Sequence, residues 1–140
     1  MVVGRSGPDE AFKILQKKVV KEFDVRVIPI QADITKPNSL ALALEKFGIR
    51  SKDVKGVLHG AACFDGDRMI HKVTDEQFEK TLAPKVRGSL EIVATSQREE
   101  WSLDFMWYMS SVVVSLGNYG QVAYGGRPHI CRSIFINLFI

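Results

Sequence analysis

The stretch Val54-Lys55-Gly56-Val57-Leu58-His59-Gly60-Ala61-Ala62 joins an apolar segment to three small residues. Its first part carries the apolar and β-branched side chains that favour a strand. Three small residues then end it. Small residues at a strand end suit either close packing or the close approach of a ligand to the backbone. The stretch therefore predicts a strand over 54–59, with both explanations open for the residues after it.

Strands and helices alternate on both sides of this stretch, with no repeat, linker or low-complexity segment between them. Apolar residues recur at helical spacing in two segments, and β-rich runs lie between these segments. We expect strands over 2–3, 25–30, 54–59 and 103–109, and helices over 8–23, 40–47 and from residue 74 onward. Strands that alternate with helices of this length form parallel β-α-β units. The sequence thus predicts an α/β protein with a doubly wound parallel sheet.

The helix after residue 74 has a distinct start and an expected interruption. Thr74 and Gln77 have the spacing of a capping box, in which each side chain bonds the other residue's backbone N–H. Pro84 follows ten residues later. Because proline lacks the N–H that a helix interior needs, we expect a new helical segment to start at Pro84.

Polar or small residues follow every predicted strand. In open α/β sheets the carboxyl ends of the strands border the ligand crevice. Turns use the same residue types, so chain reversal is the better explanation of each segment taken alone. Their combination favours a binding site built from Arg5, Ser6, Asp33, the segment His59-Gly60-Ala61-Ala62, and Ser110-Ser111.

Composition and charge exclude several classes of function. The chain has 140 residues and a net charge of +3, which is too small and too dispersed to indicate nucleic-acid binding. Its longest apolar run, 134–140, is far shorter than the roughly 20 residues that span a bilayer. Cys63 and Cys131 lie in unrelated contexts and provide no metal-ligand spacing. We expect a cytoplasmic protein without a metal site or a membrane span.

Lys85, Ser111 and Tyr124 together indicate a chemistry. A phenol donates a proton, a hydroxyl polarises a carbonyl, and a nearby ammonium lowers the pKa of the phenol from about 10 toward neutrality. These groups suit reduction of a carbonyl by a nicotinamide cofactor. Separately, a solvated lysine, a turn serine and a half-buried tyrosine are each ordinary.

The motifs now described resemble the ketoreductase domains of polyketide synthases and animal-type fatty acid synthases, in the short-chain dehydrogenase/reductase superfamily. The resemblance runs from Val2 to Tyr124. Ala32-Asp33-Ile34-Thr35 is similar to the family's adenine-binding turn, and 56–62 to its "GVxHxAG" segment. The two most specific matches are Leu82-Ala83-Pro84-Lys85-Val86-Arg87-Gly88, its "PKxxG" lysine segment, and Gly120-Gln121-Val122-Ala123-Tyr124.

The resemblance implies NADPH as the cofactor. It assigns the 2′-phosphate to Arg5 and Ser6, the adenine to Asp33 and Ile34, and the ribose and nicotinamide to the segment Gly60-Ala61-Ala62. A surface arginine and a helix-capping aspartate are the alternative explanations for Arg5 and Asp33. His59 is expected to be structural.

The resemblance also assigns the catalytic roles and the partners. Tyr124 is the implied proton donor, Ser111 the carbonyl donor, and Lys85 the group that lowers the tyrosine pKa and holds the nicotinamide ribose. Ser111 is preferred to Ser110 because it precedes the tyrosine by thirteen residues. The implied substrate is a β-ketoacyl thioester on the phosphopantetheine arm of an acyl carrier protein, and the implied partners are other synthase domains.

Two departures from the family pattern affect these expectations. The family's first strand and its glycine-rich, pyrophosphate-binding turn have no counterpart here, and Pro128 replaces an asparagine expected four residues after Tyr124. We therefore expect an incomplete Rossmann-like sheet, with 1–126 as a partial NADP-binding domain and 127–140 as a divergent tail. An inert truncated fragment of a synthase, and a short-chain reductase acting on a free small molecule, remain alternatives.

Overall fold

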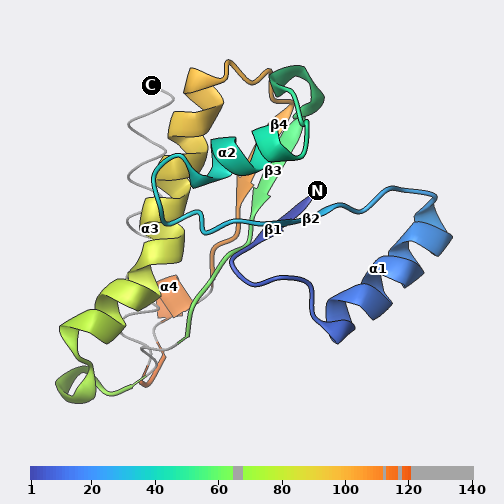
Figure 1. Cartoon of the computed structure of the whole chain (residues 1–140). Coiled ribbons are helices and arrows are strands. Elements are labelled where there is room, and N and C mark those ends of the chain that lie inside the picture. The colour runs from blue at the N-terminus through green and yellow to red at the C-terminus, as the bar shows by residue number, and fades with distance from the viewer. Residues whose placement is uncertain (65–67, 112, 117, 121–140) are drawn as a thin grey trace.

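Figure 1 shows the computed structural model of the chain, which describes residues 1–64, 68–111, 113–116 and 118–120. Within these residues strands and helices alternate as the sequence predicts. The strands are β1 (Val2–Gly4), β2 (Pro29–Gln31), β3 (Gly56–His59) and β4 (Phe105–Tyr108). The helices are α1 (Glu10–Phe23), α2 (Ser39–Lys46), α3 (Asp75–Arg98) and α4 (Val113–Leu116), with 3-10 turns η1 (Ser51–Asp53) and η2 (Ile70–Lys72).

The strands form two parallel pairs. β1 pairs with β2, placing Val3 opposite Ile30, and β3 pairs with β4, placing Leu58 opposite Trp107. Among the described residues each pair is a separate two-stranded sheet. This arrangement confirms the prediction of an incomplete doubly wound α/β fold.

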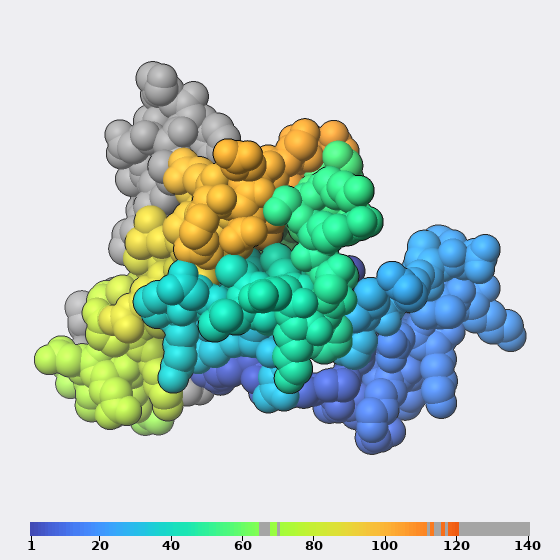
Figure 2. Space-filling view, turned by 45° about the horizontal axis from the view of Figure 1, so that its top comes forward, coloured from blue at the N-terminus to red at the C-terminus, as the bar shows by residue number. Residues whose placement is uncertain are grey.

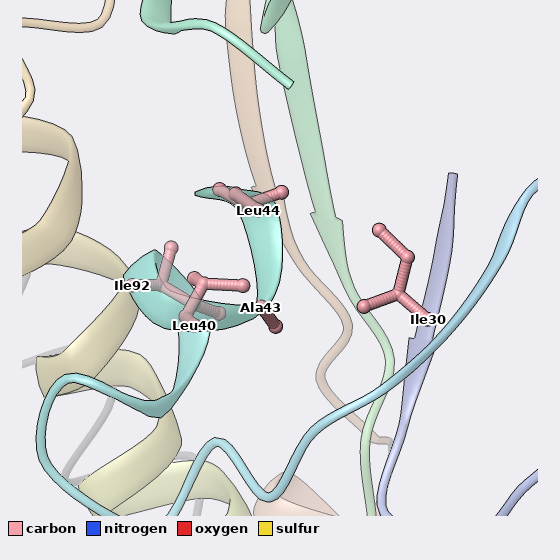
Figure 3. Packing of buried hydrophobic residues seen from close by; sticks show 5 residues of the cluster. All are labelled: Ile30, Leu40, Ala43, Leu44 and Ile92. Atoms are coloured by element: carbon pink, nitrogen blue, oxygen red, sulfur yellow. The ribbon is translucent and has the colours of Figure 1, made fainter. Parts of the chain in front are cut away.

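The core lies between the sheets and helices α2 and α3. Figure 3 shows Ile30 of β2 pointing toward Leu40, Ala43 and Leu44 of α2 and Ile92 of α3. Residues on one face of each strand complete it, among them Val3, Val57 and Met106. Burial of these apolar side chains fixes how α2 and α3 lie against the strands.

Helix α3 is continuous, and the expected segment break at Pro84 is therefore wrong. The helix runs from Asp75 to Arg98 with Pro84 inside it. Proline in a helix interior costs about 3 kcal/mol. Buried side chains on both sides of Pro84 hold the two halves against the rest of the protein, because Thr81 precedes it and Ser89 and Ile92 follow it. The capping box of Thr74 and Gln77 at its start is confirmed.

The other face of the β3–β4 sheet is exposed. Leu58 and Trp107 lie side by side in register, and each exposes about three fifths of its surface, 59% and 62%. The ring of Phe105 extends this apolar face over Gly56, where a Cβ would lie 2.3 Å from the ring. Among the described residues nothing buries this face.

Helix α1 lies apart from the core. Its amino end is capped by the Asp9 carboxylate, which accepts from the Phe12 amide at 2.7 Å, so the helix begins two residues later than expected. None of its residues is buried, and Leu15 and Phe23 are exposed. Figure 2 shows this segment, in blue, at one side of the molecule. Within the part of the chain that the structure describes, no helix has the length and apolarity needed to cross a bilayer.

Candidate active site

The segment after β2 and the end of β3 meet at Gly88 of α3. A Cβ added to Gly88 would lie 2.8 Å from Ile34 Cδ1, which follows β2, and 3.6 Å from His59 Cε1, which ends β3. The absence of a side chain at Gly88 therefore lets the ends of two different sheets approach the same point of α3. The segments proposed from the sequence lie along this side of the molecule.

Lys85 joins the ends of β3 and β4. Its side chain is only 7% exposed, and its Nζ donates to the carbonyl oxygen of His59 at 3.2 Å and to that of Met109 at 2.8 Å. A buried ammonium requires such hydrogen bonds, because its desolvation is otherwise costly. The Lys85 ammonium therefore lies beside the start of Gly60, which follows His59. It also lies near Ser111, which is two residues after Met109.

Ser111 lies between β4 and α4. Its Oγ accepts a hydrogen bond from the amide of Val113 at 3.3 Å, the local contact of a serine that starts a helical turn. This contact uses the oxygen as an acceptor, so it does not occupy the hydroxyl proton. Ser110 is exposed. Tyr124 lies outside the described residues, so its position relative to Lys85 and Ser111 stays a prediction.

Asp33 forms a tight turn after β2. Its Oδ1 accepts from the Thr35 hydroxyl at 2.7 Å and from the Thr35 amide at 3.1 Å. These bonds, with the positive charge of Arg5, hold the pKa of the Asp33 carboxyl below its ordinary value. Helix α2 begins later, with Asn38 as its N-cap, so Asp33 does not cap it. The carboxylate is ionised and keeps its second oxygen, Oδ2, for a further donor, because no hydrogen bond to Oδ2 occurs within the described residues.

Ile34 is turned toward the core. It packs against the buried cluster and lies next to Gly88. Its side chain therefore anchors the Asp33 turn on α3, and contact with an adenine ring through this side chain stays untested.

Arg5 and Ser6 follow β1 and are exposed. The side chain of Gln31 donates to the Arg5 carbonyl at 3.2 Å, and the Ala32 amide donates to the Gly4 carbonyl at 2.9 Å. These bonds hold the loop after β1 beside the loop after β2. The Arg5 charge lies near enough to Asp33 to lower its pKa, so the two predicted cofactor residues are brought together.

Gly60, Ala61 and Ala62 are exposed beyond β3, as a backbone that accepts a ligand must be. A different part of the molecule contains a hollow of about 670 Å³ between α2 and the end of α3, lined by Asn38, Arg50, Arg98 and Trp101 among others. It lies at the amino ends of β3 and β4, away from Lys85. The described residues include no cluster of histidine, cysteine and carboxylate side chains that would hold a metal.

Comparison with known proteins agrees with this geometry. Residues 1–129 match the family profile described as KR domain. The chain belongs to the KR domain family. Polyketide synthase 19 of Gibberella fujikuroi is 31% identical to this KR domain over 134 residues, which cover 96% of this chain and 5% of that protein. The 6-methylsalicylic acid synthase of Penicillium patulum is 35% identical over 104 residues, covering 72% and 6% respectively.

Solved structures show the same fold. An N-terminal ketoreductase from a macrolactin assembly line superimposes with a TM-score of 0.71 at 28% identity, covering 88% of this KR domain and 24% of that chain. Levodione reductase, at 19% identity, has a TM-score of 0.76 and covers 96% and 53%. The KR domain therefore has the Rossmann-like fold of short-chain dehydrogenases. It spans a small fraction of its curated relatives and about a quarter of that ketoreductase chain.

Proposed function

We propose that this KR domain takes part in the NADPH-dependent reduction of a β-ketoacyl thioester carried by an acyl carrier protein, within a larger synthase. The main support is the position of Lys85, whose ammonium is held by the carbonyls of His59 and Met109. It lies at the junction of the two segments that the resemblance assigns to the cofactor and to the substrate carbonyl.

The proposed proton transfer uses the groups of the chain as follows. Tyr124 donates its phenolic proton to the carbonyl oxygen as the oxygen gains negative charge, and the Ser111 hydroxyl donates a hydrogen bond to the same oxygen. The Lys85 ammonium favours the ionised phenol and so lowers its pKa. NADPH, when bound, supplies the hydride.

The residues at the strand ends are compatible with NADPH. The Asp33 carboxylate is kept ionised and offers Oδ2 to the amino group of adenine. The Arg5 guanidinium is exposed beside it and suits a 2′-phosphate. The exposed Gly60, Ala61 and Ala62 leave the backbone open to the ribose and the nicotinamide.

Replacing Tyr124 with phenylalanine tests the proposal. Removing the phenolic proton is expected to lower the rate of NADPH-dependent reduction of a β-ketoacyl thioester by about 10²- to 10⁴-fold, with NADPH binding unchanged. Binding is followed by the fluorescence of Trp101 and Trp107. Tyr119→Phe is the matched control, because Tyr119 is 85% exposed and near in sequence. Full activity in Tyr124→Phe would exclude the assigned role.

A second candidate is a non-catalytic polypeptide that associates with further chain segments. The observation in its favour is that the described residues form a pair of separate sheets with an exposed apolar face at Leu58 and Trp107. The two candidates differ in an NADPH titration of the folded chain. Saturable binding that prefers NADPH to NADH favours the reductase, and its absence favours the second candidate.

A further inference from the structure

His59 is almost fully buried at the end of β3, with only 3% of its surface exposed. Its imidazole lies edge-on to the ring of Tyr108, with ring centroids 5.4 Å apart. The Nε2 atom is 3.1 Å from the carbonyl oxygen of Pro84. Because a carbonyl oxygen only accepts, Nε2 must carry the proton of this hydrogen bond.

The charge state of His59 agrees with this contact. Burial, and next the positive charge of Lys85, lower the pKa of His59 to about 4. The imidazole is therefore neutral at physiological pH. Among the described residues, the titratable groups that face it are Lys85 from α3 and Tyr108 from β4.

His59 contacts two consecutive residues of α3 through different groups. Its side chain bonds the Pro84 carbonyl, and its own carbonyl accepts from the Lys85 ammonium. His59 therefore fixes two things: the position of α3 along β3, and the direction of the Lys85 side chain. A register shift of α3 would break both bonds.

We propose that His59 is a positioning residue for Lys85. It orients the Lys85 side chain through two hydrogen bonds, one from its imidazole to the Pro84 carbonyl and one from the Lys85 ammonium to its own backbone oxygen. This inference rests on the proposed function, because the place of the Lys85 ammonium matters for catalysis only if Lys85 acts on Tyr124. His59 itself touches neither the cofactor nor the reacting carbonyl in this scheme.

The first test measures the reactivity of each lysine toward acetic anhydride by mass spectrometry. His59→Leu removes the donor to Pro84, and His59→Gln keeps a side-chain N–H. Loss of one such buried hydrogen bond is expected to raise the acetylation rate of Lys85 about tenfold, while His59→Gln stays near the wild-type rate. His71→Leu is the matched control, because His71 is exposed on η2. Acetylation of the exposed Lys17 and Lys52 should not change in any variant.

Hydrogen exchange at Ile92 and Val93 shows whether α3 remains folded in the variants. An unchanged Lys85 rate in a folded His59→Leu protein would overturn the proposal, as would a tenfold rise in a folded His59→Gln protein.

A second measurement uses the wild-type chain and needs no variant to fold. Nitrogen NMR of the imidazole is expected to show the Nε2–H tautomer, with a proton that exchanges slowly and a pKa well below the ordinary histidine value. The other tautomer, or an ordinary titration, would overturn the proposal. Neither measurement uses turnover or NADPH, so failure of the proposed reductase function would be seen separately.

Discussion

At the scale of single residues, the site depends on buried charge held by backbone atoms. Lys85 is a cation with little exposure whose ammonium is held by the carbonyls of His59 and Met109. Each of these carbonyls lies at the end of a strand. The position of the ammonium therefore depends on how β3 and β4 lie relative to α3. Arg5 differs, because it is an exposed cation whose backbone carbonyl accepts from Gln31 and whose charge lies near the Asp33 carboxylate.

Replacing Arg5 tests its assignment to the 2′-phosphate of NADPH. Arg5→Ser is expected to weaken NADPH binding about 10- to 100-fold, because one charge-assisted contact with the 2′-phosphate is lost. NADH binding should change little, since NADH lacks that phosphate. Parallel titrations with both cofactors measure the ratio. Arg26→Ser is the charge-matched control, because Arg26 is exposed near the amino end of β2. Equal weakening of both cofactors would contradict the assignment of Arg5.

At the scale of elements, α3 is the structure on which the site is assembled. It carries Lys85. The carbonyl of its Pro84 accepts a hydrogen bond from the His59 side chain, and Ile34 packs against its Gly88. The turn that carries Asp33 is thus linked to α3 through the neighbouring Ile34. A change in packing at Gly88 should reach Asp33 through Ile34, which the resemblance also assigns to the adenine.

Gly88→Ala tests this link. Its Cβ would lie 2.8 Å from Ile34 Cδ1, so Ile34 must move. Overpacking typically costs about 1–3 kcal/mol, against a gain of about 1 kcal/mol in helix propensity. We expect lower hydrogen-exchange protection at Ile30 and weaker NADPH binding. Adding Ile34→Val removes Cδ1 but keeps Cγ1, which lies 3.1 Å from the added Cβ, so it should restore part of both, which a double-mutant cycle measures. Effects that simply add would show that Gly88 and Ile34 are not coupled.

At the scale of the whole molecule, burial is one-sided. Helices α2 and α3 cover the face of the strands that carries Val57 and Met106, while Leu58 and Trp107 on the opposite face are exposed. Helix α1 has no buried residue and lies at the side of the molecule (Figure 2). An apolar face of this kind normally marks an interaction surface or a cause of aggregation.

We therefore expect the purified 140-residue chain to be marginally stable, with a broad thermal transition and binding of an apolar dye such as ANS. Trp107→Thr should reduce dye binding and preserve the fold, because its side chain is 62% exposed. Met106→Thr, the neighbouring change on the covered face, should reduce far-ultraviolet circular dichroism and stability. A sharp cooperative melt without dye binding would contradict this expectation.

The sequence alone determined the order of elements, the start of α3 and the segments that border the site. These features arise from local causes: apolar periodicity, the capping box of Thr74 and Gln77, and turn residues after each strand. The class of protein followed from motifs that are contiguous in the chain. The assignments of Tyr124 and of the cofactor residues remain predictions that rest on those motifs.

Only the tertiary structure decided that α3 continues through Pro84, that Asp33 bonds Thr35 without capping α2, and what His59 contacts. Two partners of Lys85 are backbone carbonyls 26 and 24 residues away. Every residue has such a carbonyl, so no residue type marks those two as partners. Long-range packing selects them, because the buried ammonium is stable only where strand ends supply acceptors.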